Sequence, residues 1–549
     1  MKEPIVYALK SKSSDPDTLH LHEAMKEPDA DRFVDAIIKE INGHSENDHW
    51  EVIPANSVPI GSSVLPAVWA MRRVRDLVTN GVRKFKARIN LDGSKQVFGK
   101  DYTETYSPVV NWIFIRFLFI LALLNNWHTA QIDFVMAYPQ AKLDTPKYMH
   151  LPRGIVMSDE NEQKHVLKIK QNIYGGKDSG RIFYKHVAGR LVNNMKCTKS
   201  AVDDCVFYRG HVIFCFYVDD GLVFFSDVNE GRKFMDDLKK TFKIEEKGDV
   251  NDYLGVNICT HEDGSIEMRQ PQLIKHIIDD CNIIKNFKPP EIPARSSTKP
   301  LNAHVNSPPF DAHFHYRSLI GKCNYLEKST RPDIAFATHQ CARFSQSPKK
   351  QHGHALTFLA KYLSGTADKG LIMKPDTSKS LECFVDADFS GLYDPSIPND
   401  VSTSKSRTGF VIRFAGCNIL WRSVLQTTIS LSSTEAEYVA LSTALREVIP
   451  LIEFLKELKS LGIATYSTHA DVHCKCFEDN SGALELARLP KIRPRTKHIN
   501  LSYHHFRSHV QDGSISIHPI KSEDQLADIF TKPLEVKLFQ RLRKLLIGW

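Results

Sequence analysis

Two apolar runs separated by a pair of acids form the most informative pattern in this chain. Val212–Phe216 and Leu222–Phe225 predict two strands, and the residues between them predict a tight turn. Adjacent side chains on a strand point to opposite faces, so Asp219 and Asp220 can share one site only at the tip of a hairpin. A solvated turn is the alternative interpretation, because Asp220-Gly221 is a common turn pair.

A third acid changes this picture. Asp133 stands inside another apolar, strand-like run, and Tyr138 follows it closely. Burying uncompensated carboxylates among Phe and Val costs several kcal/mol, and a bound divalent cation is the usual compensation. Acids on two apolar segments therefore favour a metal site over a solvated turn.

Other segments predict helices and a linker. Apolar residues recur at helical spacing from Phe33 to Ile41, and the run Trp112–Leu124 predicts a buried helix that is too short to span a bilayer. Helices are expected again from Tyr316 to about Tyr362. The proline-rich segments Lys288–Pro293 and Ser307–Pro309 bracket a linker before them, because repeated prolines block helix and central strand alike.

The last third of the chain carries four more acids at the ends of predicted elements. Leu381–Asp388 predicts a strand that ends in acids, and a helix follows with Ser432 or Ser433 as its N-cap. Phe477–Asn480 ends another strand, and Gln525–Lys532 holds a late acid. The candidate acids are Asp386, Glu437 with Glu435 as its competitor, Asp479 and Asp528.

Length and composition limit the number of domains and the class of protein. At 549 residues the chain is too long for one core and predicts two or three domains. Its 42% hydrophobic and 25% charged residues describe an ordinary soluble globular protein. The N-terminus lacks the apolar core of a signal peptide, so no secretory route is indicated. Eleven cysteines without a paired framework fit a reducing compartment.

Basic residues gather beside the candidate acids. The net charge of +8 is mildly basic, as a nucleic-acid binder requires. Charge runs are more often solvated faces, but two clusters that flank acidic sites favour contact with phosphates. The first cluster comprises Arg72, Arg73, Arg75, Arg83, Lys84, Lys86 and Arg88, and the second Lys491, Arg493, Arg495, Lys497 and His498.

Several motifs together resemble the reverse transcriptase of copia-type LTR retrotransposons. They are the Tyr-Val-Asp-Asp box at Tyr217–Asp220, Asp133 with Ala137-Tyr138, and Lys86-Ala87-Arg88. Further matching segments occur in the family's order, namely Asp101–Val109, Tyr174-Gly175, Tyr253-Leu254-Gly255 and Thr330–Ile334. Near the C-terminus, the order of strand, helix, strand and late acid resembles an RNase H fold.

The resemblance implies a multidomain chain of α/β and α+β class, with a right-hand polymerase followed by an RNase H-like domain. The expected domains are a flexible segment over residues 1–22, the fingers, palm and thumb-like segment over 23–286, a linker and helical connection over 287–379, and an RNase H-like domain over 380–549. The implied function is an RNA-directed DNA polymerase with linked RNase H, from the C-terminal part of a Pol polyprotein.

The resemblance also assigns roles to the acids. Both activities use two metal ions per active site, Mg²⁺ with Mn²⁺ as its alternative, and Mg²⁺ prefers hard oxygen ligands such as carboxylates. Asp133 and Asp219 are expected to hold the polymerase ions, with Asp220 as the second hairpin acid near the primer end. The expected RNase H ligands are Asp386, Glu437, Asp479 and Asp528.

Other roles follow in the same way. Lys86 and Arg88 resemble the residues that grip the triphosphate, since arginine suits bidentate phosphate contact. Tyr138 resembles the residue beneath the incoming sugar that excludes a 2′-hydroxyl, and a palm-core tyrosine is its structural alternative. The segment Tyr253, Leu254 and Gly255 resembles the one that positions the primer end, and an ordinary strand terminus is the alternative.

One departure from the family affects the nucleotide site. Family members usually have Gln where this chain has Asp178, beside the incoming nucleotide. A carboxylate there should repel the triphosphate unless Lys177 or Arg181 neutralises it. A weakened relic that folds and binds nucleic acid without efficient synthesis is therefore the second hypothesis, although all seven candidate metal ligands are intact.

Expected partners are an RNA template, a DNA primer, the RNA–DNA hybrid and deoxynucleoside triphosphates, without a membrane. The expected location is the cytoplasm, within virus-like particles, with nuclear access for the complex. The sequence leaves the oligomeric state open. A zinc site at His469, His473, Cys474 and Cys476 is not expected, because their spacing matches no familiar zinc module.

Overall fold

A computed structural model describes residues 17–76, 81–153, 165–283, 287–295, 307–311, 314–395, 397, 400–463, 472–488 and 501–549. The chain divides into two compact units. The first unit comprises residues 1–110 and 129–249, and the second comprises 111–128 and 250–549. The two compact units combine stretches that are distant in the sequence, whereas the sequence analysis divided the chain into four consecutive segments. The boundaries of those four segments stay predictions.

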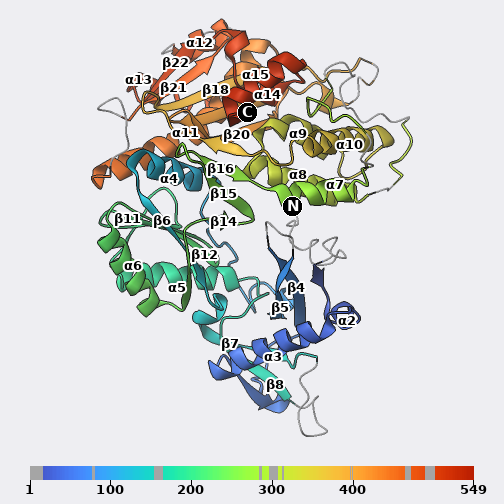
Figure 1. Cartoon of the computed structure of the whole chain (residues 1–549), viewed down its shortest axis with the longest axis vertical. Helices are drawn as coiled ribbons and strands as arrows, with labels where there is room; N and C mark the ends of the chain where they lie inside the picture. The colour runs from blue at the N-terminus through green and yellow to red at the C-terminus, as the bar shows by residue number, and fades with distance from the viewer. Residues whose placement is uncertain are drawn as a thin grey trace. The chain divides into compact units, whose positions relative to one another are not determined.

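A six-stranded sheet in the first unit carries the paired acids, in the order β13-β6-β12-β11-β10-β9 (Figure 1). Tyr217 pairs with Asp220 across β11 and β12, so the predicted hairpin is confirmed. Helices α5 (Ser179–Asn193) and α6 (Val228–Thr241) pack aromatic rings against this sheet. The strands are β6 (His128–Phe134), β9 (Thr198–Lys199), β10 (Val206–Arg209), β11 (Val212–Tyr217), β12 (Asp220–Phe225) and β13 (Ile244–Gly248).

Two smaller sheets complete the first unit, in the orders β1-β4-β5 and β2-β8-β7-β3. The predicted helix near Phe33 forms as α3, and Phe33 is fully buried in the core beneath β5. Alternate residues of β5 enter this core, which leaves Lys86 and Arg88 on the opposite face. The elements are β1 (Thr18–Leu19), α2 (Leu21–Ala24), α3 (Ala30–Glu46), β2 (Trp50–Pro54), β3 (Val64–Leu65), β4 (Ala67–Arg75), β5 (Val82–Leu91), β7 (Lys142–His150) and β8 (His165–Gln171).

The second unit begins, after α4 (Trp112–Asn125), with a four-stranded sheet and four helices. Residues of the Thr330–Ile334 motif form buried polar contacts in this part of the second unit. Arg331 and Asp333 form a fully buried ion pair of 2.8 Å, and the Tyr362 hydroxyl donates to Asp333 at 2.6 Å. The elements are β14 (Asp252–Tyr253), β15 (Val256–Thr260), β16 (Ile266–Arg269), β17 (Leu371–Met373), α7 (Pro271–Asp280), α8 (Tyr316–Ser329), α9 (Ala335–Ala342) and α10 (Lys350–Ser364).

A five-stranded sheet in the order β20-β19-β18-β21-β22 follows, which we call the RNase H-like sheet. The first three strands are antiparallel, whereas β21 and β22 run parallel to β18. Ser432 is the N-cap of α11, since its hydroxyl accepts from the Glu435 N–H at 3.1 Å. The elements are β18 (Leu381–Asp388), β19 (Arg407–Phe414), β20 (Cys417–Leu425), α11 (Ser433–Ser460), β21 (Cys474–Glu478), α12 (Ser481–Arg488), α13 (Arg507–Gln511), β22 (Ile515–Pro519), α14 (Asp528–Thr531) and α15 (Val536–Ile547).

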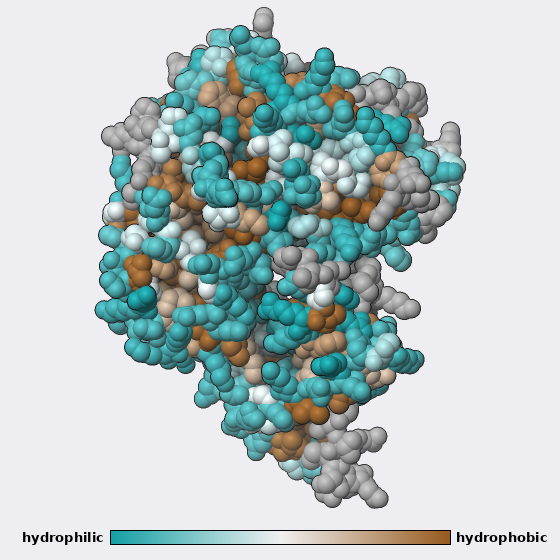
Figure 2. Space-filling view, viewed as in Figure 1, coloured by the Kyte–Doolittle hydropathy of each residue, from teal (hydrophilic) through white to brown (hydrophobic). Residues whose placement is uncertain are grey.

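These sheets confirm the predicted mixed α/β multidomain class. Every cysteine is a free thiol, and all except Cys259 are buried. Among the described residues, no helix combines the length and apolarity that a membrane crossing needs. On the face drawn in Figure 2, hydrophilic residues predominate and apolar ones are scattered between them.

Candidate active sites

The first acidic site forms where β6 meets the tip of the β11–β12 hairpin. The Phe134 N–H donates to the carbonyl oxygen of Asp219 at 2.8 Å, which holds Asp133 beside the turn. Val218 in that turn has a φ of 54°, an unfavourable value for a β-branched residue. Such local strain is common at functional sites.

Gly221 allows this close approach of the strands. A Cβ at this position would lie 2.8 Å from side-chain carbons of Ile132 on β6 and Phe214 on β11. Any larger residue would push β6 away from the hairpin. The glycine after the paired acids is therefore required by the close packing of β6 and β11 against it.

The carboxylates of this site sit in a partly desolvated environment. Burial raises the pKa of Asp133, and the neighbouring Asp219 raises it further, whereas Lys247 lowers it. Asp219 is 29% exposed and Asp220 is also half-buried. Asp133 and Asp219 are thus both partly accessible to solvent and repel each other, which favours a cation between them.

A basic face of β4 and β5 adjoins these acids. The Arg88 guanidinium lies 3.5 Å from the Asp219 carboxylate and 4.4 Å above the ring of Tyr174. Burial lowers the pKa of Lys86, and the charge of Arg88 lowers it further, whereas Asp133 and Asp219 raise it. Arg88 therefore contacts Asp219, and Lys86 lies within electrostatic reach of both Asp133 and Asp219.

Tyr138 lies at the start of a short 3-10 helix just beyond β6. Its ring stacks on Tyr174 at 4.8 Å between centroids, and burial raises its pKa. The Arg88 guanidinium lies over the same Tyr174 ring. Tyr138 is therefore held in one orientation by a stack that extends to Arg88.

Asp178 has a partner that the sequence did not indicate. Its carboxylate pairs with the Lys147 ammonium at 2.5 Å, and both side chains are largely buried. Lys177 instead donates to the Tyr102 hydroxyl at 3.2 Å, and Arg181 pairs with Glu104. Lys147 and Asp178 line a cavity of about 510 Å³. The charge of Asp178 is thus balanced, but by neither of the two predicted residues.

The predicted primer-positioning segment belongs to the second unit. Tyr253 ends β14 and is fully buried, while Leu254 and Gly255 form a turn with φ values of 50° and 72°. The Tyr325 hydroxyl donates to the Leu254 carbonyl. Their role toward the primer stays a prediction.

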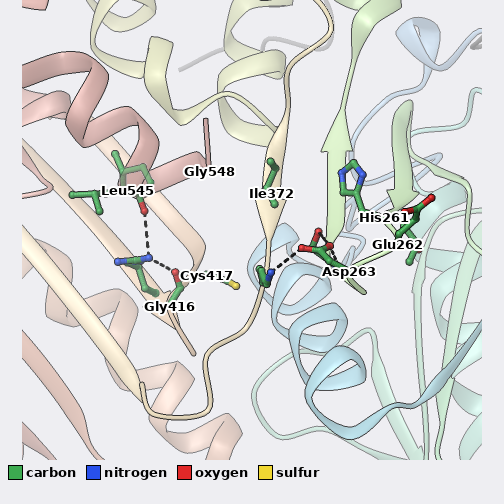
Figure 3. Close-up of a pocket in the computed structure, with 13 residues that line it drawn as sticks. His261, Glu262, Asp263, Ile372, Gly416, Cys417, Leu545 and Gly548 are labelled. Atoms are coloured by element: carbon green, nitrogen blue, oxygen red, sulfur yellow. Dashed lines mark hydrogen bonds and ion pairs between the residues drawn. The ribbon is translucent and has the colours of Figure 1, made fainter. Parts of the chain in front are cut away.

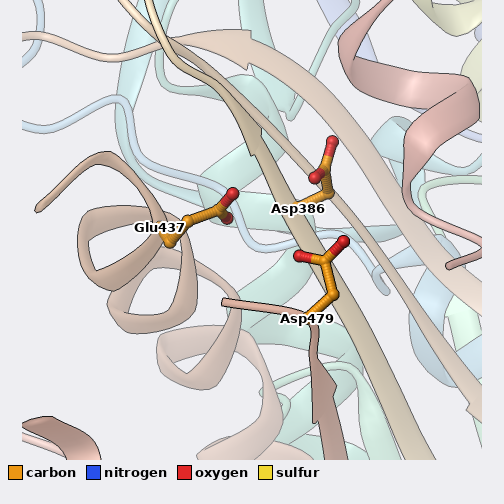
Figure 4. A group of neighbouring side chains, drawn as sticks. All are labelled: Asp386, Glu437 and Asp479. Carbon is orange, nitrogen blue, oxygen red and sulfur yellow. The ribbon is translucent and has the colours of Figure 1, made fainter. Parts of the chain in front are cut away.

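The second acidic site lies at the ends of β18 and β21 and in the first turns of α11. Ligand oxygens of Asp386, Glu437 and Asp479 all lie within 4.8 Å of one another, and Figure 4 shows the three carboxylates facing a common centre. Asp386 is 3% exposed and Glu437 6%. The predicted competitor, Glu435, instead accepts from the Leu431 N–H at 2.7 Å.

The electrostatics of this site fit a divalent cation. Burial, followed by the nearby charges of Glu478 and Asp386, raises the pKa of Glu437 to about 11. The Oε2 atoms of Glu437 and Glu478 are both buried without a hydrogen-bond partner. Crowded carboxylates with unpartnered oxygens need protons or a cation, and hard oxygen ligands suit Mg²⁺.

Asp528 stands beside this cluster and is linked to it by a lysine. Lys532 lies 2.8 Å from Asp528 and 3.8 Å from Asp386, and the Thr531 hydroxyl donates to Asp386. Burial, with Asp386 as the next contribution, raises the pKa of Asp528 to about 7. The sequence did not indicate the roles of Lys532 and Glu478. Their only signal was adjacency to Asp528 and Asp479.

Other sequence candidates lie elsewhere. Cys474 and Cys476 are buried in β21, and His473 contacts the Ser516 hydroxyl at 2.6 Å. His469 and the basic cluster from Lys491 to His498 fall outside the described residues. A cavity of about 870 Å³ in the second unit contains none of the predicted site residues (Figure 3).

Comparison with known proteins shows what residues 47–295 and the chain as a whole are similar to. Residues 47–295 match the family described as reverse transcriptase (RNA-dependent DNA polymerase). The chain is 29% identical, over 98% of its length, to the retrovirus-related Pol polyprotein from transposon TNT 1-94 of Nicotiana tabacum. It is 30% identical, over 95% of its length, to that from transposon RE2 of Arabidopsis thaliana.

Residues 47–295 are therefore similar to reverse transcriptase domains, and the predicted resemblance to copia-type Pol polyproteins is confirmed over most of the chain. The chain spans 39% and 34% of the length of these two relatives. The structure of the foamy viral protease-reverse transcriptase dRH in complex with ds DNA is similar with a TM-score of 0.44 at 13% identity. That similarity covers 89% of this chain and 69% of the other.

Proposed function

We propose that this chain is an RNA-directed DNA polymerase with a linked RNase H activity. The observation that carries the proposal is the hydrogen bond from the Phe134 N–H to the Asp219 carbonyl oxygen, which sets Asp133 beside Asp219, whose carboxylate contacts Arg88. The match of residues 47–295 to the reverse transcriptase family supports the first activity. The carboxylate cluster of Asp386, Glu437 and Asp479 supports the second.

In the polymerase site, Asp133 and Asp219 would hold Mg²⁺ or Mn²⁺ with help from Asp220, and the ions would activate the 3′-hydroxyl and stabilise the leaving pyrophosphate. Arg88 and Lys86 bind the triphosphate, because they stand next to these acids and carry the opposite charge to phosphate. Tyr138 supports the sugar and excludes a 2′-hydroxyl.

In the RNase H site, Asp386, Glu437 and Asp479 would hold the ions, with Asp528 beside them, and the ions would activate water for attack on the RNA strand. Lys532 pairs with Asp528 and Asp386 and offsets part of their negative charge. Thr531 orients the Asp386 carboxylate through its hydroxyl. The substrate is an RNA–DNA hybrid, whose 2′-hydroxyls mark the RNA strand.

The proposed partners are an RNA template, a DNA primer and deoxynucleoside triphosphates, and the proposed location is the cytoplasm within virus-like particles. The relic hypothesis rested on an unbalanced carboxylate at Asp178. The ion pair between Asp178 and Lys147 removes that objection. An active polymerase is therefore the better-supported proposal.

Primer extension tests the proposal. The wild-type chain should extend a DNA primer on an RNA template with deoxynucleotides and Mg²⁺, and Asp133→Asn should not. A ribonucleotide mixture in place of deoxynucleotides should give little product. Extension that survives Asp133→Asn would contradict the assignment of this acid.

A further inference from the structure

Two polar residues interrupt the apolar stripe of helix α3 in the first unit. Phe33, Ile37 and Ile41 pack into the core beneath β5 (Figure 1). Glu40 and His44 continue the same helical spacing, where apolar residues would be expected, and their side chains are only 14% and 1% exposed. A largely buried carboxylate is costly without polar partners, so Glu40 requires such partners nearby.

The Glu40 carboxylate accepts a hydrogen bond from the backbone of β5. Strand β5 stands at one edge of its three-stranded sheet, so the N–H groups along that edge need partners other than a strand. The Ile89 N–H donates to Oε1 of Glu40 at 3.3 Å. Two residues further along the same edge, the Leu91 N–H donates to the Tyr174 carbonyl at 2.8 Å. Glu40 and Tyr174 together thus hold this edge of β5.

Buried rings pack against the other side of Glu40. Nε2 of His44 lies 3.4 Å from Oε1 of Glu40, and the His44 ring stacks on Trp50 at 4.4 Å between centroids. The Nδ1 atoms of His44 and His49 lie 3.0 Å apart, and His49 is buried as well. These contacts restrict the Glu40 side chain and keep its carboxylate at the edge of β5.

Arg88 precedes Ile89, and its side chain leaves β5 on the face opposite the core. Its guanidinium lies 3.5 Å from the Asp219 carboxylate and 4.4 Å above the Tyr174 ring. Burial opposes the charge of Arg88, but Tyr174, Asp219 and Glu40 outweigh this effect and raise the pKa of the guanidinium. The bond from Ile89 to Glu40 therefore fixes the backbone beside a residue whose direction matters for the site.

We infer that Glu40 is a positioning residue of the triphosphate site, because it fixes the backbone of β5 at Ile89 and so aims Arg88 toward Asp219. All four residues belong to the first unit. The kinetic readout of this inference rests on the proposed function, whereas amide exchange in β5 does not.

The test compares Glu40→Met with Glu40→Gln in the full chain. Methionine removes the acceptor but suits an apolar helical stripe, whereas glutamine removes the charge but keeps an acceptor oxygen for the Ile89 N–H. Glu46→Met is the matched control, because Glu46 is an exposed glutamate of the same helix. The measurements are amide hydrogen exchange over residues 82–91, steady-state primer extension, and binding of dATP with Mg²⁺ to the chain on a template with an unextendable primer.

Glu40→Met should accelerate exchange around Ile89 by about tenfold, because this N–H loses its partner. The KM for deoxynucleotides and the Kd for dATP should rise by about tenfold, while kcat stays within about threefold of wild type, because Arg88 holds the triphosphate and the acids stay in place. Glu40→Gln and Glu46→Met should both remain within about threefold of wild type in every measurement. Recovery by glutamine separates the hydrogen bond to Ile89 from the charge of Glu40.

Dependence on Arg88 is the most specific outcome. In an Arg88→Ala background, adding Glu40→Met should change the KM by less than about twofold, because a residue that acts through Arg88 then has nothing to position. If the two substitutions instead multiply each other's effects, Glu40 acts independently of Arg88 and the inference is overturned.

An unchanged KM for Glu40→Met would also overturn the inference, and so would a loss in Glu40→Gln equal to that in Glu40→Met. If Glu40→Met does not fold by circular dichroism, Glu40→Ala takes its place. If the wild-type chain binds dATP but extends no primer, the proposed function fails, and dATP binding by the variants then decides the role of Glu40. A wild-type chain that neither binds dATP nor extends a primer would overturn both.

Discussion

The two acidic sites differ in what balances their charge. In the first unit, Arg88 contacts Asp219, Lys86 lies near Asp133 and Asp219, and both acids are partly open to solvent. In the second unit, Asp386 and Glu437 are almost fully buried, and Glu437 is surrounded by other carboxylates. The first site thus has two basic residues beside its acids, whereas the second crowds several carboxylates around Glu437 and has Lys532 paired with Asp386 and Asp528.

This difference teaches how each site should respond to protons and metal. Protonation of the second site relieves repulsion when no cation is bound, so metal and protons compete there. In the first site, the fixed basic residues Arg88 and Lys86 offset part of the negative charge. Its basic residues also give it a binding surface for an anionic substrate.

The largest expected effect is at Glu437. Glu437→Gln should reduce hybrid cleavage at least about a hundredfold, because it removes a ligand charge from the crowded site. Primer extension should be unchanged. Glu435→Gln is the matched control, since Glu435 lies in the same turn but accepts from the Leu431 N–H instead. Equal losses from the two substitutions would remove Glu437 from its assigned role.

The pH dependence of stability should separate the sites next. The pKa of Glu437 is raised from 4.5 to about 11 and that of Asp528 from 3.8 to about 7, so the folded state binds more protons than the unfolded state. Without metal, the free energy of unfolding should therefore fall as pH rises from about 5 to about 7, by up to about 1.4 kcal/mol per pH unit and per proton. Above about pH 7 the contribution of Glu437 should continue, together with that of Glu478, because burial raises the pKa of Glu478 well above its usual range as well.

Thermal or denaturant unfolding in a chelator checks this dependence. Glu437→Gln should flatten the fall, and saturating Mg²⁺ should do the same in the wild-type chain, because the cation replaces the protons. A wild-type slope identical to that of Glu437→Gln would mean that Glu437 is already ionised without metal.

A smaller effect is expected at the basic face of the first site. Arg88→Lys keeps the charge but loses the planar guanidinium, so the KM for deoxynucleotides should rise about tenfold. Arg83→Lys, an exposed position on the same strand, is the control. The KM for deoxynucleotides of both variants is measured by steady-state primer extension. An unchanged KM for Arg88→Lys would place the triphosphate elsewhere.

The smallest effect is expected at Asp178. Because Lys147 already balances its charge, Asp178→Gln should change the nucleotide KM by less than about threefold. Lys147→Gln, in contrast, leaves Asp178 unpaired and should raise the KM. If Asp178→Gln instead lowers the KM about tenfold, as an unbalanced carboxylate would require, the ion pair does not shield the nucleotide.

Local patterns in the sequence predicted much of this molecule. The hairpin at Asp219, helix α3 and the Ser432 N-cap were confirmed, because periodicity and turn chemistry act over a few residues. The buried helix α4 was confirmed for the same reason. The roles of the candidate site residues stay predictions that the assays above test.

Contacts between distant residues were beyond the reach of such patterns. Asp178 pairs with Lys147 rather than with a nearby residue, because β7 runs beside the start of α5 only in the folded chain. Arg116 meets the carbonyl of Ile419 across most of the sequence. Periodicity shows which face of an element is apolar, but it does not identify the partner of a buried charge.

The most direct test of two separate sites is a crossed pair of substitutions, Asp219→Asn and Asp386→Asn, each assayed for primer extension and for hybrid cleavage. Each acid belongs to only one cluster, so Asp219→Asn should abolish extension and spare cleavage, and Asp386→Asn should do the reverse. Loss of both activities from either substitution, in a chain that stays folded by circular dichroism, would contradict the account.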